Sequence, residues 1–172
     1  MKQILSLIAI TAISLSAMTG CAQDKSKRPS PPASVTVTTQ KGATISINYS
    51  QPSVKGRVIG KEIAPFGELW RTGANEATVF EVNKEVTVAG KKVKAGKYGL
   101  YTIPGEKEWT VILNKKSNLW GSDNYSQTDD ALRFVVVPVK SKAFTEKMTF
   151  LISTAGTVSL LWGDVQVDFG VE

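Results

Sequence analysis

Apolar and polar residues alternate along almost the whole chain from residue 33 to residue 172. The alternation is clearest in 34–38 and 45–49, which are separated by a Gln-Lys-Gly turn at 40–42. A period of two places successive side chains on opposite faces of a strand, so one face of each segment is apolar. These two segments therefore predict an antiparallel hairpin.

The same alternation continues toward the C-terminus in short segments separated by turns. Further strands are expected at 78–82, 86–88, 96–103, 108–113, 132–139, 147–153, 158–162 and 165–171. Short strands at intervals of about 8 to 12 residues are typical of an antiparallel sandwich or barrel. The best helical candidates, 61–69 and 141–146, would each make one or two turns. The pattern predicts an all-β fold, a single antiparallel β-sandwich of about nine or ten strands, with a jelly roll as one topology to consider.

Aromatic residues on the expected strands indicate how the sheets pack. Tyr98 and Tyr101 lie three residues apart on one strand and are expected to face opposite sides of the sheet. Trp109, Trp120 and Trp162 are expected in core or edge packing, and a stacking platform for sugars is the alternative.

One long segment, 51–78, does not read as a strand. It combines glycine, proline and charged residues with Phe66, Leu69 and Trp70. Long loops in compact domains are usually functional or disordered, and large apolar side chains argue against disorder. The segment is therefore the first place to look for a functional site.

The chain contains no histidine and one cysteine, Cys21. These counts exclude Ser-His-Asp triads, Cys-His dyads, histidine-bound metals, internal disulfides and multi-cysteine clusters. Catalytic chemistry would have to depend on carboxylates, Lys, Arg, Tyr, Ser or Thr. We expect no cofactor and no metal, because the aspartates of the polar loop at 122–130 match no EF-hand spacing.

The first 20 residues are typical of a signal peptide, with Lys2 followed by the apolar run 4–18. The run is short for a membrane span, which takes about 20 apolar residues. Thr19 and Gly20 directly precede Cys21, an order that resembles the bacterial lipobox, in which the cysteine is lipidated and becomes the first mature residue. An ordinary secretory signal with a nearby cysteine is the alternative.

The N-terminal region therefore predicts an exported protein that is attached to a membrane through lipidated Cys21. Residues 22–24, Ala-Gln-Asp, are compatible with delivery to the outer membrane of the cell envelope. The segment 21–33 is rich in proline and charge and is expected to be a flexible tether that holds the domain off the membrane. The folded domain is then expected to cover 34–172.

The positive charge of the chain does not favour nucleic-acid binding. The net charge is +6, but four basic residues and one acidic residue lie before Pro29, which leaves about +3 for the remainder. The domain has no dense basic run with interleaved aromatic residues. No nucleic-acid partner is therefore expected.

Five motifs give the chain a family resemblance. They are Tyr49–Ser53, Lys55–Arg57, Ala95–Pro104, Trp109–Asn114 and the distinctive run WRTGANEAT at Trp70–Thr78. Together they resemble the DUF2911 family, a group of exported bacterial proteins found largely in Bacteroidetes, over nearly all of 34–172. The resemblance implies an exported, β-rich domain. It implies no catalytic residues, because the family has no established activity.

Six residues of the long segment are candidates for ligand binding: Lys55, Arg57, Trp70, Arg71, Asn75 and Glu76. In the functional interpretation, the cations hold an anionic or polyhydroxylated ligand, Glu76 is an acid, base or hydrogen-bond acceptor, and Trp70 offers a stacking face. In the structural interpretation, which the sequence favours, Arg71 pairs with Glu76 and Trp70 closes one end of the sandwich core.

The function that the sequence favours is a non-catalytic binding or assembly module that uses the loop 51–78. Its partner would be a glycan, a peptide or an envelope protein. The alternative is a carboxylate-based hydrolase for a glycan-type substrate, in which Glu76 acts with Glu68, Asp129 or Asp164. Binding ranks above catalysis because no second acid lies in a motif as distinctive as that of Glu76. A structural role without a ligand is a third hypothesis.

Overall fold

The structure, a computed structural model, describes residues 24–172, so the expected signal peptide and Cys21 lie outside the described residues. The ten strands are β1 (Pro32–Thr38), β2 (Thr44–Ser50), β3 (Thr78–Val82), β4 (Val86–Val88), β5 (Lys91–Val93), β6 (Gly96–Ile103), β7 (Trp109–Asn114), β8 (Asp130–Val136), β9 (Val139–Ile152) and β10 (Thr157–Gly170). Two short 3₁₀ turns, η1 (Lys25–Lys27) and η2 (Gln127–Asp129), are the helical elements of this region. The all-β prediction is confirmed.

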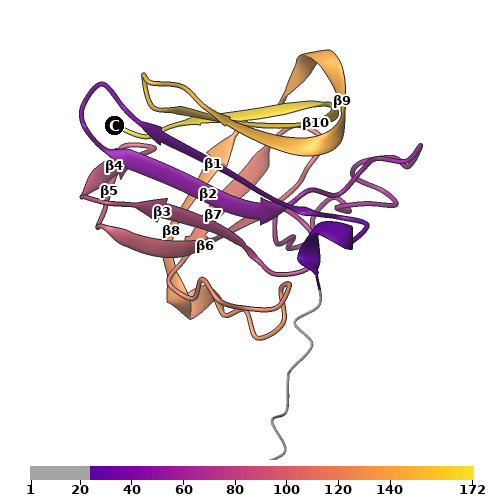
Figure 1. The fold of residues 1–172 in the computed structure, drawn as a ribbon, viewed down its shortest axis with the longest axis horizontal. Coiled ribbons are helices and arrows are strands. Elements are labelled where there is room, and N and C mark those ends of the chain that lie inside the picture. Colours follow the sequence, from indigo (N-terminus) through magenta and orange to yellow (C-terminus); the bar gives the residue numbers. More distant parts are fainter. Residues whose placement is uncertain (1–23) are drawn as a thin grey trace, which may run out of the picture.

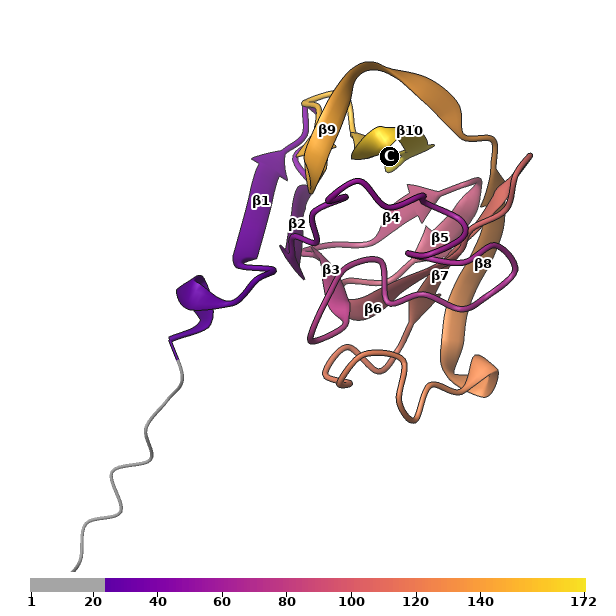
Figure 2. The same cartoon turned by 90° about the vertical axis from the view of Figure 1, so that its right-hand side faces the viewer.

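Six antiparallel strands form the main sheet, in the order β1-β2-β3-β6-β7-β8. The long strands β9 and β10 pair with each other and lie across one face of this sheet (Figures 1 and 2). The short hairpin β4–β5 stands beside them. The β1–β2 hairpin that the alternation predicts is present, with Pro32 opposite Ser50 and Thr38 opposite Thr44.

The main core lies between the six-stranded sheet and the β9–β10 pair. Ile45, Phe80 and Leu100 enter it from the sheet, and Phe150 and Leu160 enter from the opposite layer. Burial of such side chains is the main source of folding free energy, at roughly 25 cal/mol for each Å² of apolar surface. The two layers and their shared core make the domain a β-sandwich.

A second, smaller core lies on the outer face of the same sheet. Tyr101 and Ile112 are fully buried there, under Leu69 and residues of the loop between β7 and β8. Tyr98 belongs instead to the main core. The expectation that Tyr98 and Tyr101 face opposite sides is therefore confirmed, and β6 is buried on both faces.

Several expected elements differ in extent. Residues 141–146 are part of the long strand β9, and residues 61–69 form turns without an α-helix. The two strands expected at 158–162 and 165–171 are one strand, β10, with register shifts on either side of Gly163. Bulges let one strand bend around the core, which local alternation cannot distinguish from a break between two strands.

Residues 24–31, here called the arm, join the domain earlier than the sequence indicates. Strand β1 begins at Pro32, inside the segment expected to be a tether, and the backbone N–H of Gln51 donates to the Pro31 carbonyl oxygen at 2.9 Å. Within residues 24–172 no helix combines the length and the apolar character needed to cross a membrane.

Candidate functional site

The irregular segment between β2 and β3, residues 51–77, is here called the site loop. It covers one end of the sandwich in front of the main sheet (Figure 2). Its position is fixed at Trp70, whose backbone exchanges hydrogen bonds of 2.8 and 2.9 Å with Thr102 on β6. Val54 and Ile63 anchor the loop further, because both are buried in the main core. The loop is thus an ordered part of the domain.

Trp70 closes this end of the core, as the structural interpretation expects. Its ring stacks on Trp162 of β10 with ring centroids 5.1 Å apart, and it meets Trp109 of β7 edge-on at 6.3 Å. Its indole N–H donates to the Gly73 carbonyl oxygen at 3.0 Å. Core packing is confirmed for Trp109 and Trp162, whereas Trp120 is 58% exposed.

A pocket of about 300 Å³ opens between the site loop and β10. It is lined by Ser30, Pro52, Arg57, Ile63, Ala64, Trp70, Arg71, Gly73, Ala74 and Trp162. The lining includes two arginines and two tryptophans and no carboxylate. We call it the tryptophan pocket.

Trp162, which lines the tryptophan pocket, has a buried polar atom without a partner among the described residues. Trp162 is only 2% exposed, and its indole nitrogen has no hydrogen-bond acceptor among the described residues. A buried donor without an acceptor costs about 1 to 3 kcal/mol.

Arg57 lines the pocket, and some of its guanidinium N–H groups are already hydrogen-bonded. Its Nε donates to the Val54 carbonyl oxygen at 3.1 Å and its Nη2 to the Ser53 carbonyl oxygen at 2.7 Å. These bonds hold the planar fork in place and leave Nη1 available to an acceptor. Lys55 is exposed and is not one of the pocket's lining residues. Its backbone N–H donates a hydrogen bond to Glu146 Oε1 at 2.9 Å.

Arg71 and Glu76 do not pair with each other, so this part of the structural interpretation is wrong. The Arg71 side chain lies against Gly121 in the loop between β7 and β8, and its Nε is buried with no acceptor among residues 24–172. Successive side chains here point to opposite sides: Leu69 packs on the outer core and Trp70 on the main core. Arg71 therefore points away from the main core.

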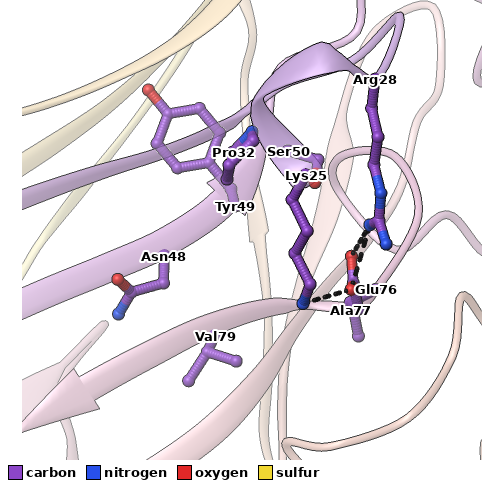
Figure 3. Close-up of a pocket in the computed structure, with 9 residues that line it drawn as sticks. All are labelled: Lys25, Arg28, Pro32, Asn48, Tyr49, Ser50, Glu76, Ala77 and Val79. Atoms are coloured by element: carbon purple, nitrogen blue, oxygen red, sulfur yellow. Dashed lines mark hydrogen bonds and ion pairs between the residues drawn. The ribbon is translucent and has the colours of Figure 1, made fainter. Parts of the chain in front are cut away.

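Glu76 binds the arm. The Lys25 ammonium donates to Glu76 Oε1 at 2.9 Å, and Arg28 Nη1 contacts both carboxylate oxygens at 3.0 and 3.1 Å (Figure 3). The hydrogen bond from Lys25 is the largest cause that lowers the pKa of Glu76, which falls to about 2, and Arg28 adds to the effect. Glu76 is therefore negatively charged throughout the neutral range.

Asn75 binds the arm as well. Its side-chain Nδ2 donates to the Ser30 carbonyl oxygen at 3.1 Å. Its backbone is left-handed, with φ of 58°, a conformation that asparagine tolerates better than most residues. The distinctive motif thus places two neighbouring side chains on the arm.

A second pocket, of about 190 Å³, has Glu76 in its lining. Figure 3 shows its lining residues, which are Lys25, Arg28, Pro32, Asn48, Tyr49, Ser50, Glu76, Ala77 and Val79. Glu76 is the single carboxylate in this lining. None of Glu68, Asp129 and Asp164 joins it there.

Lys25 and Arg28 are the site residues that sequence reasoning missed, because they lie in the segment expected to be a tether. The β1–β2 hairpin could have revealed them. Its register pairs Pro32 with Ser50, so the residues before β1 must lie beside those that follow β2. Strand β2 in turn pairs with β3, with Asn48 opposite Val79, so Glu76 just before β3 lies at the same end of the sheet. Three cations before β1 and one distinctive carboxylate before β3 are complementary in charge.

Two aspartates of the acidic loop at 122–130 form hydrogen bonds or ion pairs with other side chains of the domain. Asp130 accepts hydrogen bonds from Tyr125, Asn114 and Arg133, at 2.7 to 2.9 Å, and its side chain is largely buried. Asp129 pairs with Lys116 at 2.8 Å. In the part of the chain that the structure describes, no three side chains of His, Cys, Asp or Glu are grouped to hold a metal.

A family model described as "Protein of unknown function (DUF2911)" matches residues 30–171. The match covers β1 to β10 and the whole site loop. No curated protein and no solved structure is detectably similar to the chain.

Proposed function

The chain belongs to the DUF2911 family, whose function is unknown, and we propose that it is a non-catalytic, lipid-anchored module of the cell envelope that binds a ligand in the tryptophan pocket. The observation that carries the proposal is the combination in that pocket of the indole rings of Trp70 and Trp162 with the guanidinium of Arg57, whose Nη1 is not used by its hydrogen bonds to Val54 and Ser53. Pockets that bind small ligands are mostly apolar, with a few placed polar groups.

The chemistry of the pocket favours a ligand rich in hydrogen-bond acceptors. The Arg57 guanidinium supplies donors, and no carboxylate among the lining residues competes for them. Hydroxyl and carbonyl oxygens of a glycan, or the backbone carbonyl groups of a peptide, would meet this requirement. A segment of an envelope protein would present the same peptide groups.

The proposed location rests on the sequence of the N-terminus. The apolar run 4–18 and the order Thr-Gly-Cys at 19–21 favour export and lipidation of Cys21. Two or more acyl chains give stable attachment to a bilayer. We place the protein on the outer membrane, in agreement with the residues that follow Cys21.

The geometry around Glu76 gives the hydrolase hypothesis less support than binding. A general acid needs a proton to donate near the working pH, and the pKa of Glu76 is about 2 in its contacts with Lys25 and Arg28. The second acid that a glycosidase requires is also missing from the lining of its pocket. Holding the arm is a simpler role for this carboxylate.

The proposal is tested by comparing ligand binding by two variants, Arg57→Ala and Lys55→Ala, with that of the wild-type chain. Glycan and peptide arrays with the wild-type chain identify a ligand, and titration calorimetry then measures its affinity. Arg57→Ala should weaken binding by roughly tenfold or more, because a hydrogen bond to a charged donor is lost. Lys55→Ala removes the same charge from an exposed neighbour outside the pocket and should leave the affinity unchanged. Equal affinities for all three chains would refute the pocket as the binding site.

A further inference from the structure

We infer that the arm is a docked element and that, together with Trp120, it forms the surface that lies against the membrane. The occupant of this surface is the lipid leaflet that holds the acyl chains of Cys21. The inference rests on the proposed lipidation of Cys21. The sequence predicts a flexible tether, whereas a docked arm would hold the domain in one orientation on the membrane.

The first step is that the arm is bound along its length. Lys25 and Arg28 hold Glu76, the Ser30 carbonyl accepts from Asn75, and the Pro31 carbonyl accepts from Gln51. A free tether would make none of these bonds. The 3₁₀ turn η1, closed by the Asp24 side chain that accepts from the Ser26 backbone, adds local order.

The second step is the reach of the remaining chain. Only Ala22 and Gln23 separate Cys21 from Asp24. Consecutive Cα atoms are about 3.8 Å apart, so the Cα atom of Cys21 lies at most about 11 Å from that of Asp24. With Asp24 on the domain and Cys21 in the lipid headgroup region, the arm must lie close to the membrane surface.

The third step is the exposed aromatic residue beside the arm. The loop segment 119–121 runs antiparallel to 75–77, with backbone hydrogen bonds from Ala77 to Leu119 and from Gly121 to Asn75. Trp120 is therefore opposite Glu76, the residue that binds the arm. Trp120 as a whole residue is 58% exposed.

Exposed tryptophan and lysine side chains are both typical of a membrane interface. Tryptophan prefers the headgroup level of a bilayer, and exposed lysines are attracted to anionic lipids. Lys27 of the arm has a side chain that is 83% exposed. The site loop lies at the same end of the sandwich as the arm, away from the C-terminus (Figures 1 and 2), and it exposes Val58 and Phe66.

This orientation also places the tryptophan pocket near the membrane. Ser30 of the arm is one of the pocket's lining residues, so the docked arm forms part of its wall. A ligand would then be met at the lipid surface.

The experiment uses the full mature chain in vesicles of phosphatidylcholine and phosphatidylglycerol that contain a brominated lipid. Bromine quenches tryptophan fluorescence only on close approach. We expect clear quenching of the wild-type chain and loss of most of it in Trp120→Phe, because Trp109 and Trp162 are buried and Trp70 is partly buried in its packing against both. The control adds Lys41→Trp to Trp120→Phe. Lys41 lies at the other end of the sandwich, paired with Glu172, and this new tryptophan should stay unquenched.

Docking of the arm is measured on the same vesicles with trypsin, which cleaves after Lys25 and Lys27 but not after Arg28, because Pro29 follows it. The wild-type domain should be released at least several-fold more slowly than Glu76→Lys, in which the carboxylate is replaced by a repelling charge. Glu81→Lys is the matched control, because Glu81 pairs with Lys97 on the main sheet, and should be released as slowly as wild type.

Two results would overturn the inference while the proposed anchor stands. One is equal quenching of wild type and Trp120→Phe in a chain whose mass confirms acylation. The other is equal trypsin release of wild type and Glu76→Lys. A mature chain without acyl groups would overturn the anchor and the membrane surface together, and its trypsin protection would still report whether the arm is docked.

Discussion

At the scale of single residues, the role of Glu76 is decided by its neighbours in space. The residue stands in the most distinctive motif of the chain, and its side chain is 39% exposed in contact with Lys25 and Arg28. Exposed ion pairs contribute about 0 to 1 kcal/mol each, so these contacts position the arm more than they stabilise the fold. Their effect is local order at the N-terminal end of the domain.

The ionisation of Glu76 should make the arm sensitive to acid. The pKa of Glu76 falls from an ordinary value of 4.5 to about 2 in the folded protein, so its contribution to stability is present above pH 4.5 and is lost as the pH falls through 2. We expect wild type to exceed Glu76→Gln in free energy of unfolding by about 1 kcal/mol at pH 7. Urea titrations at several pH values should find that this difference shrinks between pH 5 and pH 2. A difference that does not change with pH would contradict the assignment.

At the scale of elements, the β9–β10 hairpin shows how one layer of the sandwich is held. The two strands pair over most of their length, and the turn between them contacts the end of the chain, where the Val171 backbone N–H donates to the Gly156 carbonyl at 2.8 Å. Val171 also pairs with Val88 of β4. The hairpin turn, the C-terminus and the small β4–β5 sheet therefore depend on one another.

Gly156 is the position where this arrangement requires glycine. Its φ is 94°, and a Cβ atom there would overlap the Val171 carbonyl oxygen. Gly156→Ala should lower the free energy of unfolding by about 3 kcal/mol, because strain and overpacking both act. Chemical denaturation measures the change.

Two other glycines provide the controls for Gly156→Ala. Gly170→Ala meets no atom within 4 Å and has no positive φ, so it should change stability by less than about 1 kcal/mol. Gly90 has a φ of 76°, and a Cβ atom there would meet nothing within 4 Å. Gly90→Ala therefore measures the cost of backbone strain alone. If Gly156→Ala were no worse than Gly90→Ala, the contact with Val171 would not matter.

At the scale of the whole molecule, the functional elements gather at one end of the sandwich. The arm and the site loop lie there, the C-terminus lies at the other end, and the loop between β7 and β8 runs along the lower edge toward the arm (Figure 1). The two pockets described above are both partly lined by the arm, through Lys25 and Arg28 in one and Ser30 in the other. The proposed attachment and the proposed ligand binding therefore both involve the arm.

The anchor proposal makes a prediction about the location of the whole chain. Wild type should be found in the membrane fraction and should carry acyl groups at Cys21, since two or more chains give stable attachment. Cys21→Ser should move the protein to the soluble fraction, with a mass that lacks the acyl groups. Fractionation and intact-mass measurement test both points. A wild-type chain that is soluble and unmodified would contradict the anchor.

Much of the fold follows from the sequence alone. The period of two determines which faces of the strands are apolar, and it predicted the all-β class, the first hairpin and the opposite orientations of Tyr98 and Tyr101. The large apolar residues of the long segment likewise indicated order, and Trp70 does close the core. These features depend on local pattern, which a sequence contains in full.

The partners of the site residues were decided by tertiary structure. Local pattern could not show that Glu76 meets Lys25 and Arg28, about 50 residues earlier, because that contact depends on the register of β1 with β2. Nor could it show that Trp162, far along the chain, would stack on Trp70 and line a pocket with Arg57. Side-chain periodicity determines which face is buried, but only strand pairing and layer packing determine which residues meet.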